Sequence, residues 1–171
     1  MSQEFIERVI EIKRVSKVTK GGKRLRISAV AVVGDGKSMV GVGHGKAVEV
    51  AQAVRKAIER AKKEMVKISI KERTIPHEVT GKYCSSKILL KPASPGTGII
   101  ACRQVRAVLE ALGLKDVLSK SFGSRNPLNL ARATIKALQQ LRTLEEIARA
   151  RNKPISYFVE KKDEKDKSKT G

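Results

Sequence analysis

Apolar residues recur along this chain with two spacings, and each spacing predicts one kind of secondary structure. Alternating or continuous apolar runs at 9–18, 27–33 and 39–42 predict three β-strands. From about Ala47 to Val66 the apolar residues return every three or four positions, which predicts an amphipathic helix. The expected apolar stripe of this helix consists of Val50, Ala51, Val54, Ile58, Ala61 and Met65. The first part of the chain is therefore expected to fold as β-β-β-α.

A second series of elements follows residues 67–76, where the apolar pattern stops, charges alternate and Pro76 excludes a regular strand. Strands are predicted at 79–83, 86–91 and 116–121, and helices at about 100–112 and 127–142. The helices are expected to bury Val105, Val108, Leu109 and Leu112, and then Leu130 or Ala131, Ile135, Leu138 and Leu141. The order is β-β-α-β-α, and a mixed sheet with helices on one face is its simplest packing.

Local signals predict where the helices of the second half begin and end. Gly113 is typical of a helix end, and Asn126 followed by Pro127 is typical of a helix start. The sequence TLEE at 143–146 is a capping box and predicts a short last helix. Residues 159–171 carry many charges and few apolar residues, which predicts a disordered tail.

These patterns predict an α+β protein with two domains, at 9–70 and 71–158, ahead of the tail. The boundary near Lys71 contains no long flexible linker. We therefore expect the two domains to pack on each other through a modest interface.

The charge of the chain indicates the kind of molecule that it binds. The 171 residues include 37 basic and 17 acidic ones, a net charge of +20. Residues 1–70 hold 16 basic and 7 acidic residues, and 71–158 hold 16 and 6, so both halves are expected to contact an anionic partner. Only five aromatic residues occur, too few to stack a long single strand. Structured RNA, held through its phosphates and its shape, is the partner that this composition favours.

Other features of the composition exclude several classes of protein. No apolar run is long enough to cross a membrane, and the N-terminus has no apolar signal segment. The two cysteines, Cys84 and Cys102, lack metal-ligand spacing, and so few thiols indicate a reducing compartment. A cytoplasmic protein without a membrane partner or a cofactor is expected.

Glycines stand between the third predicted strand and the first helix. Gly41, Gly43 and Gly45 alternate with other residues and run into Lys46. We expect a loop at the helix N-terminus, where unpaired N–H groups bind phosphate. The spacing matches neither the Walker loop nor the Rossmann fingerprint, which disfavours a mononucleotide. The alternative is that the glycines only allow strand and helix to pack closely.

The candidate RNA contacts are basic side chains around this loop, in the turn at 19–26 and in the second half. Four basic residues within the seven positions 20–26 make that turn the densest cluster. The expected phosphate contacts in the first half are Lys20, Lys23, Arg24, Arg26, Lys37, His44, Lys46, Arg55, Lys56, Lys62 and Lys63. In the second half, Arg103, Arg106, Arg125 and Arg132 are expected to face RNA or protein.

Nothing in the sequence indicates a catalytic or metal site. His44 and His77, the only histidines, are far apart, and no zinc motif or catalytic triad pattern occurs. The loop at 92–99 precedes a helix and could hold a nucleotide phosphate, which leaves a phosphotransferase as a rival. A free regulator that binds double-stranded RNA is a second rival, although the basic, domain-sized second half argues against it. We expect a protein that is not an enzyme.

Three stretches together resemble the family of bacterial small-subunit ribosomal protein number five. They are VTKGGKRLR with VVGDGKSMVGVGHGKAVEVAQAVRKA at 18–57, PASPGTGIIA at 92–101, and FGSRNPLNLARAT at 122–134. The resemblance covers about residues 9–142 in order. One departure is Cys102-Arg103, where the family usually has two glycines.

The resemblance implies a fold, a location in the cell's machinery for protein synthesis and a set of binding partners. The first domain would be similar to the double-stranded-RNA-binding fold, and the second would be a split β-α-β domain. The protein would be a structural constituent of the small ribosomal subunit that binds ribosomal RNA, supports assembly and contributes to accuracy near the messenger RNA entry path. Ribosomal proteins number four and number eight would be its neighbours. Arg103 and Arg106 would face protein number four, whereas Arg125 and Arg132 would face RNA.

Overall fold

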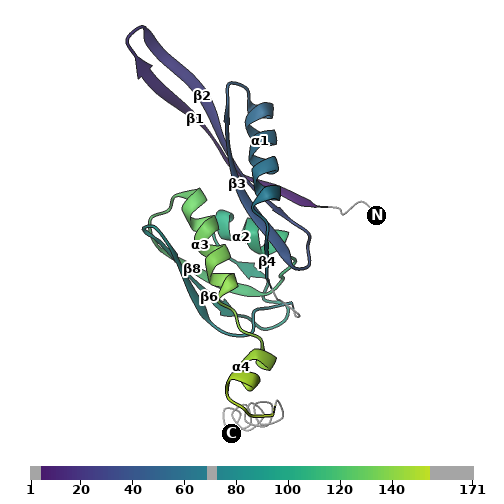
Figure 1. Cartoon of the computed structure of the whole chain (residues 1–171). Helices are drawn as coiled ribbons and strands as arrows, with labels where there is room; N and C mark the ends of the chain where they lie inside the picture. The colour runs from purple at the N-terminus through teal and green to yellow at the C-terminus, as the bar shows by residue number, and fades with distance from the viewer. Residues whose placement is uncertain (1–4, 69–72, 155–171) are drawn as a thin grey trace.

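Two four-stranded sheets organise the molecule (Figure 1). The computed structural model describes residues 5–68 and 73–154. The elements of the first half are β1 (Ile6–Thr19), β2 (Gly22–Gly34), β3 (Met39–Ala47), α1 (Val50–Lys63) and β4 (Val66–Lys67). Their strands form one antiparallel sheet in the order β1-β2-β3-β4. The predicted β-β-β-α order is confirmed, and the short β4 is an addition that the sequence pattern did not indicate.

The second half adds a sheet in the order β5-β6-β8-β7. Its elements are β5 (Val79–Tyr83), β6 (Ser86–Pro92), β7 (Ile99–Ile100), α2 (Arg103–Ala111), β8 (Val117–Gly123), α3 (Pro127–Gln139) and α4 (Leu144–Ala150). Strands β7 and β8 are parallel and are connected through α2, which makes the split β-α-β unit. The α+β class is confirmed. Strand β7 was not expected, and α2 begins three residues later than predicted.

Helices α2 and α3 lie between the two sheets. Helix α2 contacts β1 and β2 of the first sheet, while α3 contacts β3 on one side and β5 and β6 on the other. Buried Val30, Val32 and Val42 of the first half belong to the same core cluster as Val105 and Leu109 of α2. One apolar core therefore continues from one half into the other, and the expectation that the interface between the halves is modest stays a prediction.

The predicted N-terminal caps of α3 and α4 agree with the structure. The side chain of Asn126 accepts hydrogen bonds from the N–H groups of Leu128 and Asn129, and Pro127 occupies the first helical position. Thr143 and Glu146 form both hydrogen bonds of the capping box. Short-range sequence signals were sufficient here because each cap is made within three or four residues.

Helix α1 packs on its sheet through a narrower stripe than the apolar pattern predicted. The buried residues are Ala53, Ala57 and Ala61, whereas Val50 is 45% exposed. Opposite these alanines, β3 presents glycines, so the helix backbone comes very close to the strand. The small residues are buried because they permit this approach.

The β1–β2 hairpin extends beyond the rest of the first sheet (Figure 1). The last pair between β2 and β3 is Ile27 with Ala47. Past this pair, β1 and β2 continue with only each other as neighbours, down to the pair of Thr19 with Gly22. A two-stranded arm without its own core is marginal in water, so this arm is suited to being held by a partner.

Candidate RNA interface

One face of the projecting hairpin is lined with basic side chains. In the antiparallel register Lys17 lies opposite Arg24, and Lys13 lies opposite Ser28, which in turn pairs with Lys46 of β3. Because paired residues and every second residue point to the same side, these cations share one face. We define the basic hairpin face as Lys13, Lys17, Arg24, Arg26 and Lys46, all of which are exposed.

The hairpin carries a concentrated positive charge, and the ion pair of Lys13 with Glu11 at 3.0 Å offsets only one of its cations. Between residues 12 and 26 the sequence contains seven basic and no acidic residues. Lys17 and Arg24 stand directly across from each other, an arrangement that costs free energy unless an anion lies between them. A phosphate backbone supplies such anions in a row, which makes this arm the best candidate for RNA contact.

Three cations of this arm were missed by the sequence interpretation. Lys13, Arg14 and Lys17 lie in β1 and were treated only as part of a strand pattern. The signal that could have found them is the lack of acidic residues from position 12 through the turn. Of the predicted contacts, Arg24, Arg26 and Lys46 do share the basic hairpin face, and Lys20 and Lys23 lie at the tip.

The other predicted contacts of the first half lie elsewhere. Arg55, Lys56 and Lys63 are exposed on α1, which covers the sheet face opposite the basic hairpin face. Lys62 is 2.9 Å from Glu7 and lies over the ring of Phe5. Lys37 belongs to the β2–β3 turn at the far end of the sheet. The predicted contacts are therefore distributed over three surfaces, and their binding of RNA stays a prediction.

The phosphate-binding loop expected at the start of α1 is not present. Gly41, Gly43 and Gly45 lie inside β3, and the helix begins only after Glu49. A Cβ atom on any of these glycines would overlap a backbone carbonyl oxygen of α1, that of Ala61, Ala57 or Ala53 respectively. The expectation of a glycine loop was wrong, and the alternative of close strand–helix packing is correct.

His44 points to the same side as the basic hairpin face and is held by neighbours. Its Nε2 atom shares a hydrogen bond of 2.7 Å with the Ser28 hydroxyl, and its carbonyl accepts one of 2.7 Å from Arg60. Partial burial of the ring, together with the nearby cations Lys46, Arg60 and Arg132, lowers the pKa of His44 below the ordinary 6.5. The ring is therefore neutral at pH 7 and would contact RNA through hydrogen bonding rather than charge.

We expect His44 in the free protein to titrate below pH 6.5, followed by NMR of its ring protons. Because the unfolded chain then binds more protons than the folded one below pH 6.5, the group removes stability as the pH falls through this window. Lys46→Gln should raise the pKa of His44 by removing one neighbouring cation. Titration of His44 at or above 6.5 would contradict this account.

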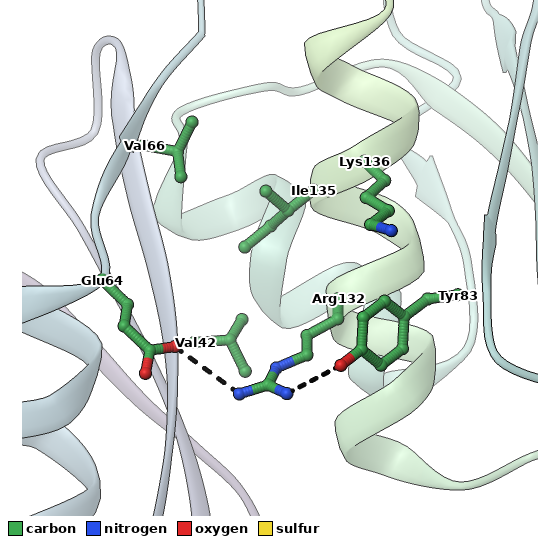
Figure 2. A pocket seen from close by; sticks show the side chains of 7 residues that line it. All are labelled: Val42, Glu64, Val66, Tyr83, Arg132, Ile135 and Lys136. Atoms are coloured by element: carbon green, nitrogen blue, oxygen red, sulfur yellow. Dashed lines mark hydrogen bonds and ion pairs between the residues drawn. The ribbon is translucent and has the colours of Figure 1, made fainter.

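Arg132 connects the two halves of the molecule (Figure 2). One guanidinium nitrogen lies 3.5 Å from the Glu64 carboxylate, just past α1, and the other donates a 2.9 Å hydrogen bond to the Tyr83 hydroxyl of β5. The guanidinium also lies over the ring of Tyr83, as does the ammonium of Lys136. Arg132 therefore positions the two halves relative to each other. A contact of Arg132 with RNA would have to use the part of its side chain that remains exposed. Arg125, in the loop before α3, is exposed.

The start of α2 carries the two arginines expected to face a protein. Both Arg103 and Arg106 are exposed. Arg106 donates a 3.0 Å hydrogen bond to the carbonyl of Ile99 in β7, so it also holds the preceding loop. Cys102, at the position where the family usually has glycine, is the N-cap residue and makes no side-chain cap.

The two glycine N–H groups of the loop at 93–98 are not free to bind a nucleotide phosphate. The buried carboxylate of Asp116 accepts hydrogen bonds from the N–H groups of Gly96 at 3.1 Å and Gly98 at 2.9 Å. An internal carboxylate thus occupies the place that a phosphate would need. The feature that supported a phosphotransferase is therefore structural.

Within residues 5–68 and 73–154, no three His, Cys, Asp or Glu side chains gather closely enough to hold a metal ion. None of the helices in this described part is long and apolar enough to span a membrane.

Comparison with known proteins identifies the family. The model of the ribosomal protein S5 N-terminal domain matches residues 5–69, and that of the ribosomal protein S5 C-terminal domain matches residues 81–151. The small ribosomal subunit protein uS5 of Chloroflexus aurantiacus is 50% identical over 159 residues, which cover 93% of this chain and 89% of the relative. Proteins of this family are structural, so the prediction that the chain is not an enzyme is confirmed. The chain belongs to the ribosomal protein S5 family of the small ribosomal subunit.

Proposed function

We propose that this constituent of the small ribosomal subunit binds ribosomal RNA chiefly through the basic hairpin face, supports subunit assembly, and contributes to decoding accuracy near the messenger RNA entry path. The single observation that supports this proposal best is the hairpin itself. It extends past β3, contains seven cations and no acid between residues 12 and 26, and has no core of its own.

The chemistry of the hairpin suits the backbone of folded RNA. No aromatic side chain occurs between residues 12 and 26, so this arm cannot stack bases in series. Lysine and arginine side chains on a twisted two-stranded ribbon can follow a groove and replace counterions on successive phosphates. Recognition would therefore depend on shape and charge, with little reading of base sequence.

The experiment that tests this function is sedimentation of a cell extract at moderate salt. The protein should migrate with the small subunit and move to the top of the gradient when the RNA is digested. A protein that stays free at moderate salt, or that remains on large particles after digestion, would contradict the proposal.

The neighbours would be ribosomal proteins number four and number eight, and messenger RNA would pass nearby. For number four, the exposed start of α2 with Arg103 and Arg106 is the surface that we propose. It lies in the second half, whereas the basic hairpin face belongs to the first, so protein and RNA contacts can be separated by substitution.

Arg106→Ala is expected to weaken binding to protein number four by roughly threefold to tenfold, since it removes the hydrogen bond to Ile99 and loosens the loop before α2. Affinity for ribosomal RNA should not change, whereas a misreading reporter in cells should show altered accuracy. Arg149→Ala, on exposed α4, is the matched control. Lost RNA affinity with unchanged accuracy would assign Arg106 to the RNA-facing group instead.

A further inference from the structure

Within residues 5–68 and 73–154, no helix covers one face of the second sheet. Helix α3 packs against one side of β5 and β6, where Gly81, Ile88 and Leu90 are buried. Alternate residues of β5, β6 and β8 point to the opposite side. We define the lysine face as the exposed Lys82, Lys87, Lys91 and Lys120 together with half-buried Leu89 and exposed Phe122. No acidic residue lies within the three strands that form it.

The register brings these lysines together as direct neighbours. Lys82 lies opposite Lys87, and Lys120 lies opposite Leu89, which places it diagonally beside Lys87 and Lys91. Like charges directly across strands destabilise a sheet. Among the described residues, the only ion pair on this face is Lys91 with Glu78, at 3.3 Å. Three lysines therefore keep an uncompensated charge that an anionic partner would relieve.

The composition of the face favours RNA over a protein as that partner. Lysine is depleted in protein–protein interfaces, whereas it is a regular phosphate contact. Phe122 is 47% exposed and lies directly opposite Lys87. A base stacked on this ring would have its own phosphate within reach of the neighbouring ammonium, which is the arrangement that proteins use for unpaired nucleotides.

The lysine face is separate from the basic hairpin face. Helices α2 and α3 lie between the two sheets, and the lysine face is on the far side of the second sheet. An RNA segment on one face cannot simultaneously contact the other without passing around the protein. The two faces would therefore engage different segments.

We propose that the lysine face is a second RNA-binding surface, which takes an unpaired segment of ribosomal RNA through phosphate contacts with Lys87 and Lys120 and one base stacked on Phe122. This rests on the proposed function, because it assumes that the chain is held in ribosomal RNA. It adds that the protein bridges two RNA segments instead of binding along one.

A charge variant tests the phosphate contacts. Lys87→Gln with Lys120→Gln in the full chain should lower affinity for deproteinised small-subunit ribosomal RNA about tenfold or more at 0.1 M salt. The slope of log affinity against log salt should fall by about 1.4–1.8, for two contacts at 0.7–0.9 each. The matched control removes the same charge from exposed positions outside every proposed surface, as Lys67→Gln with Lys115→Gln. Equal losses in both variants would overturn the proposal, even if the parent protein binds RNA as proposed.

A cross-linking experiment tests the identity of the partner. A photoreactive phenylalanine analogue replaces Phe122 in one protein and Lys17 in a second, and each is irradiated in assembled small subunits. We expect both to cross-link to RNA, at nucleotides in different segments. A cross-link from position 122 to a protein, to the same segment as position 17, or to nothing would overturn the proposal. Parent binding and the position 17 cross-link report separately on the proposed function.

Discussion

Gly43→Ala is expected to unfold the first half of the protein, although it adds only one methyl group. The new Cβ atom would overlap the carbonyl oxygen of Ala57 in α1 and crowd the N–H group of Ala61. Both are backbone atoms of a regular helix, so neither can turn aside as a side chain would. We expect a loss of at least about 4 kcal/mol in the free energy of unfolding, measured by urea denaturation followed by circular dichroism.

Gly21→Ala is the matched control, because a Cβ atom at Gly21 meets nothing within 4 Å. This substitution should leave stability unchanged or raise it slightly, since alanine has less conformational freedom than glycine in the unfolded chain. The opposite changes in stability that we expect for Gly43→Ala and Gly21→Ala distinguish close packing from the general effect of replacing a glycine. If Gly43→Ala folded normally but lost RNA affinity, the phosphate-loop interpretation would have to be restored.

Replacing four cations of the basic hairpin face by glutamine should nearly abolish specific RNA binding. The variant carries Lys13→Gln, Lys17→Gln, Arg24→Gln and Arg26→Gln. If each cation contacts one phosphate, the slope of log affinity against log salt should decrease by about 3, and affinity at 0.1 M salt should fall about a thousandfold. Filter binding to small-subunit ribosomal RNA over a range of salt concentrations measures both quantities.

A control of equal charge separates local contacts from the net charge of +20. Lys67, Arg73, Lys115 and Arg149 are exposed outside the proposed surfaces and can be replaced by glutamine together. This control should lose far less affinity. The hairpin variant should also keep or raise its melting temperature, because the substitutions relieve the repulsion between Lys17 and Arg24. Comparable affinity losses in the two variants would mean that binding follows net charge and that the hairpin has no special role.

The glycines of β3 form a sequence pattern that fits more than one structure. Glycine can serve a tight loop, a phosphate contact or a close approach of backbones, and these uses share one pattern in the sequence. Only the register of β3 against α1 shows that Gly41, Gly43 and Gly45 each face an alanine of the helix. The same limitation affected the apolar stripe of α1, because the predicted stripe included Ala61 but omitted the buried Ala53 and Ala57.

The candidate RNA interface was also predictable only in part from the sequence. Net charge and the scarcity of aromatic residues were enough to indicate a phosphate-bound RNA partner, and the quoted motifs were enough to indicate the family. Which cations act together could not be predicted, since Lys13, Lys17 and Lys46 meet on one face only through the pairing of three strands. Likewise, the contact of Arg132 with Glu64 and Tyr83 joins residues that are 49 or more positions apart in the chain.

By itself, the sequence determined the order of the main elements, the helix caps at Asn126 and Thr143, the apolar stripes of α2 and α3, and the class of partner. Each of these depends on signals within one or two helical turns, or on composition summed over the whole chain. The tertiary structure alone decided that the two halves share one core and that α1 packs directly on the glycines of β3. It alone also decided that the hairpin and the second sheet present basic faces on opposite sides of α2 and α3. These features depend on contacts between residues that are far apart in the sequence. The geometry of such contacts is fixed only in the folded chain, where close packing of the backbones permits one arrangement.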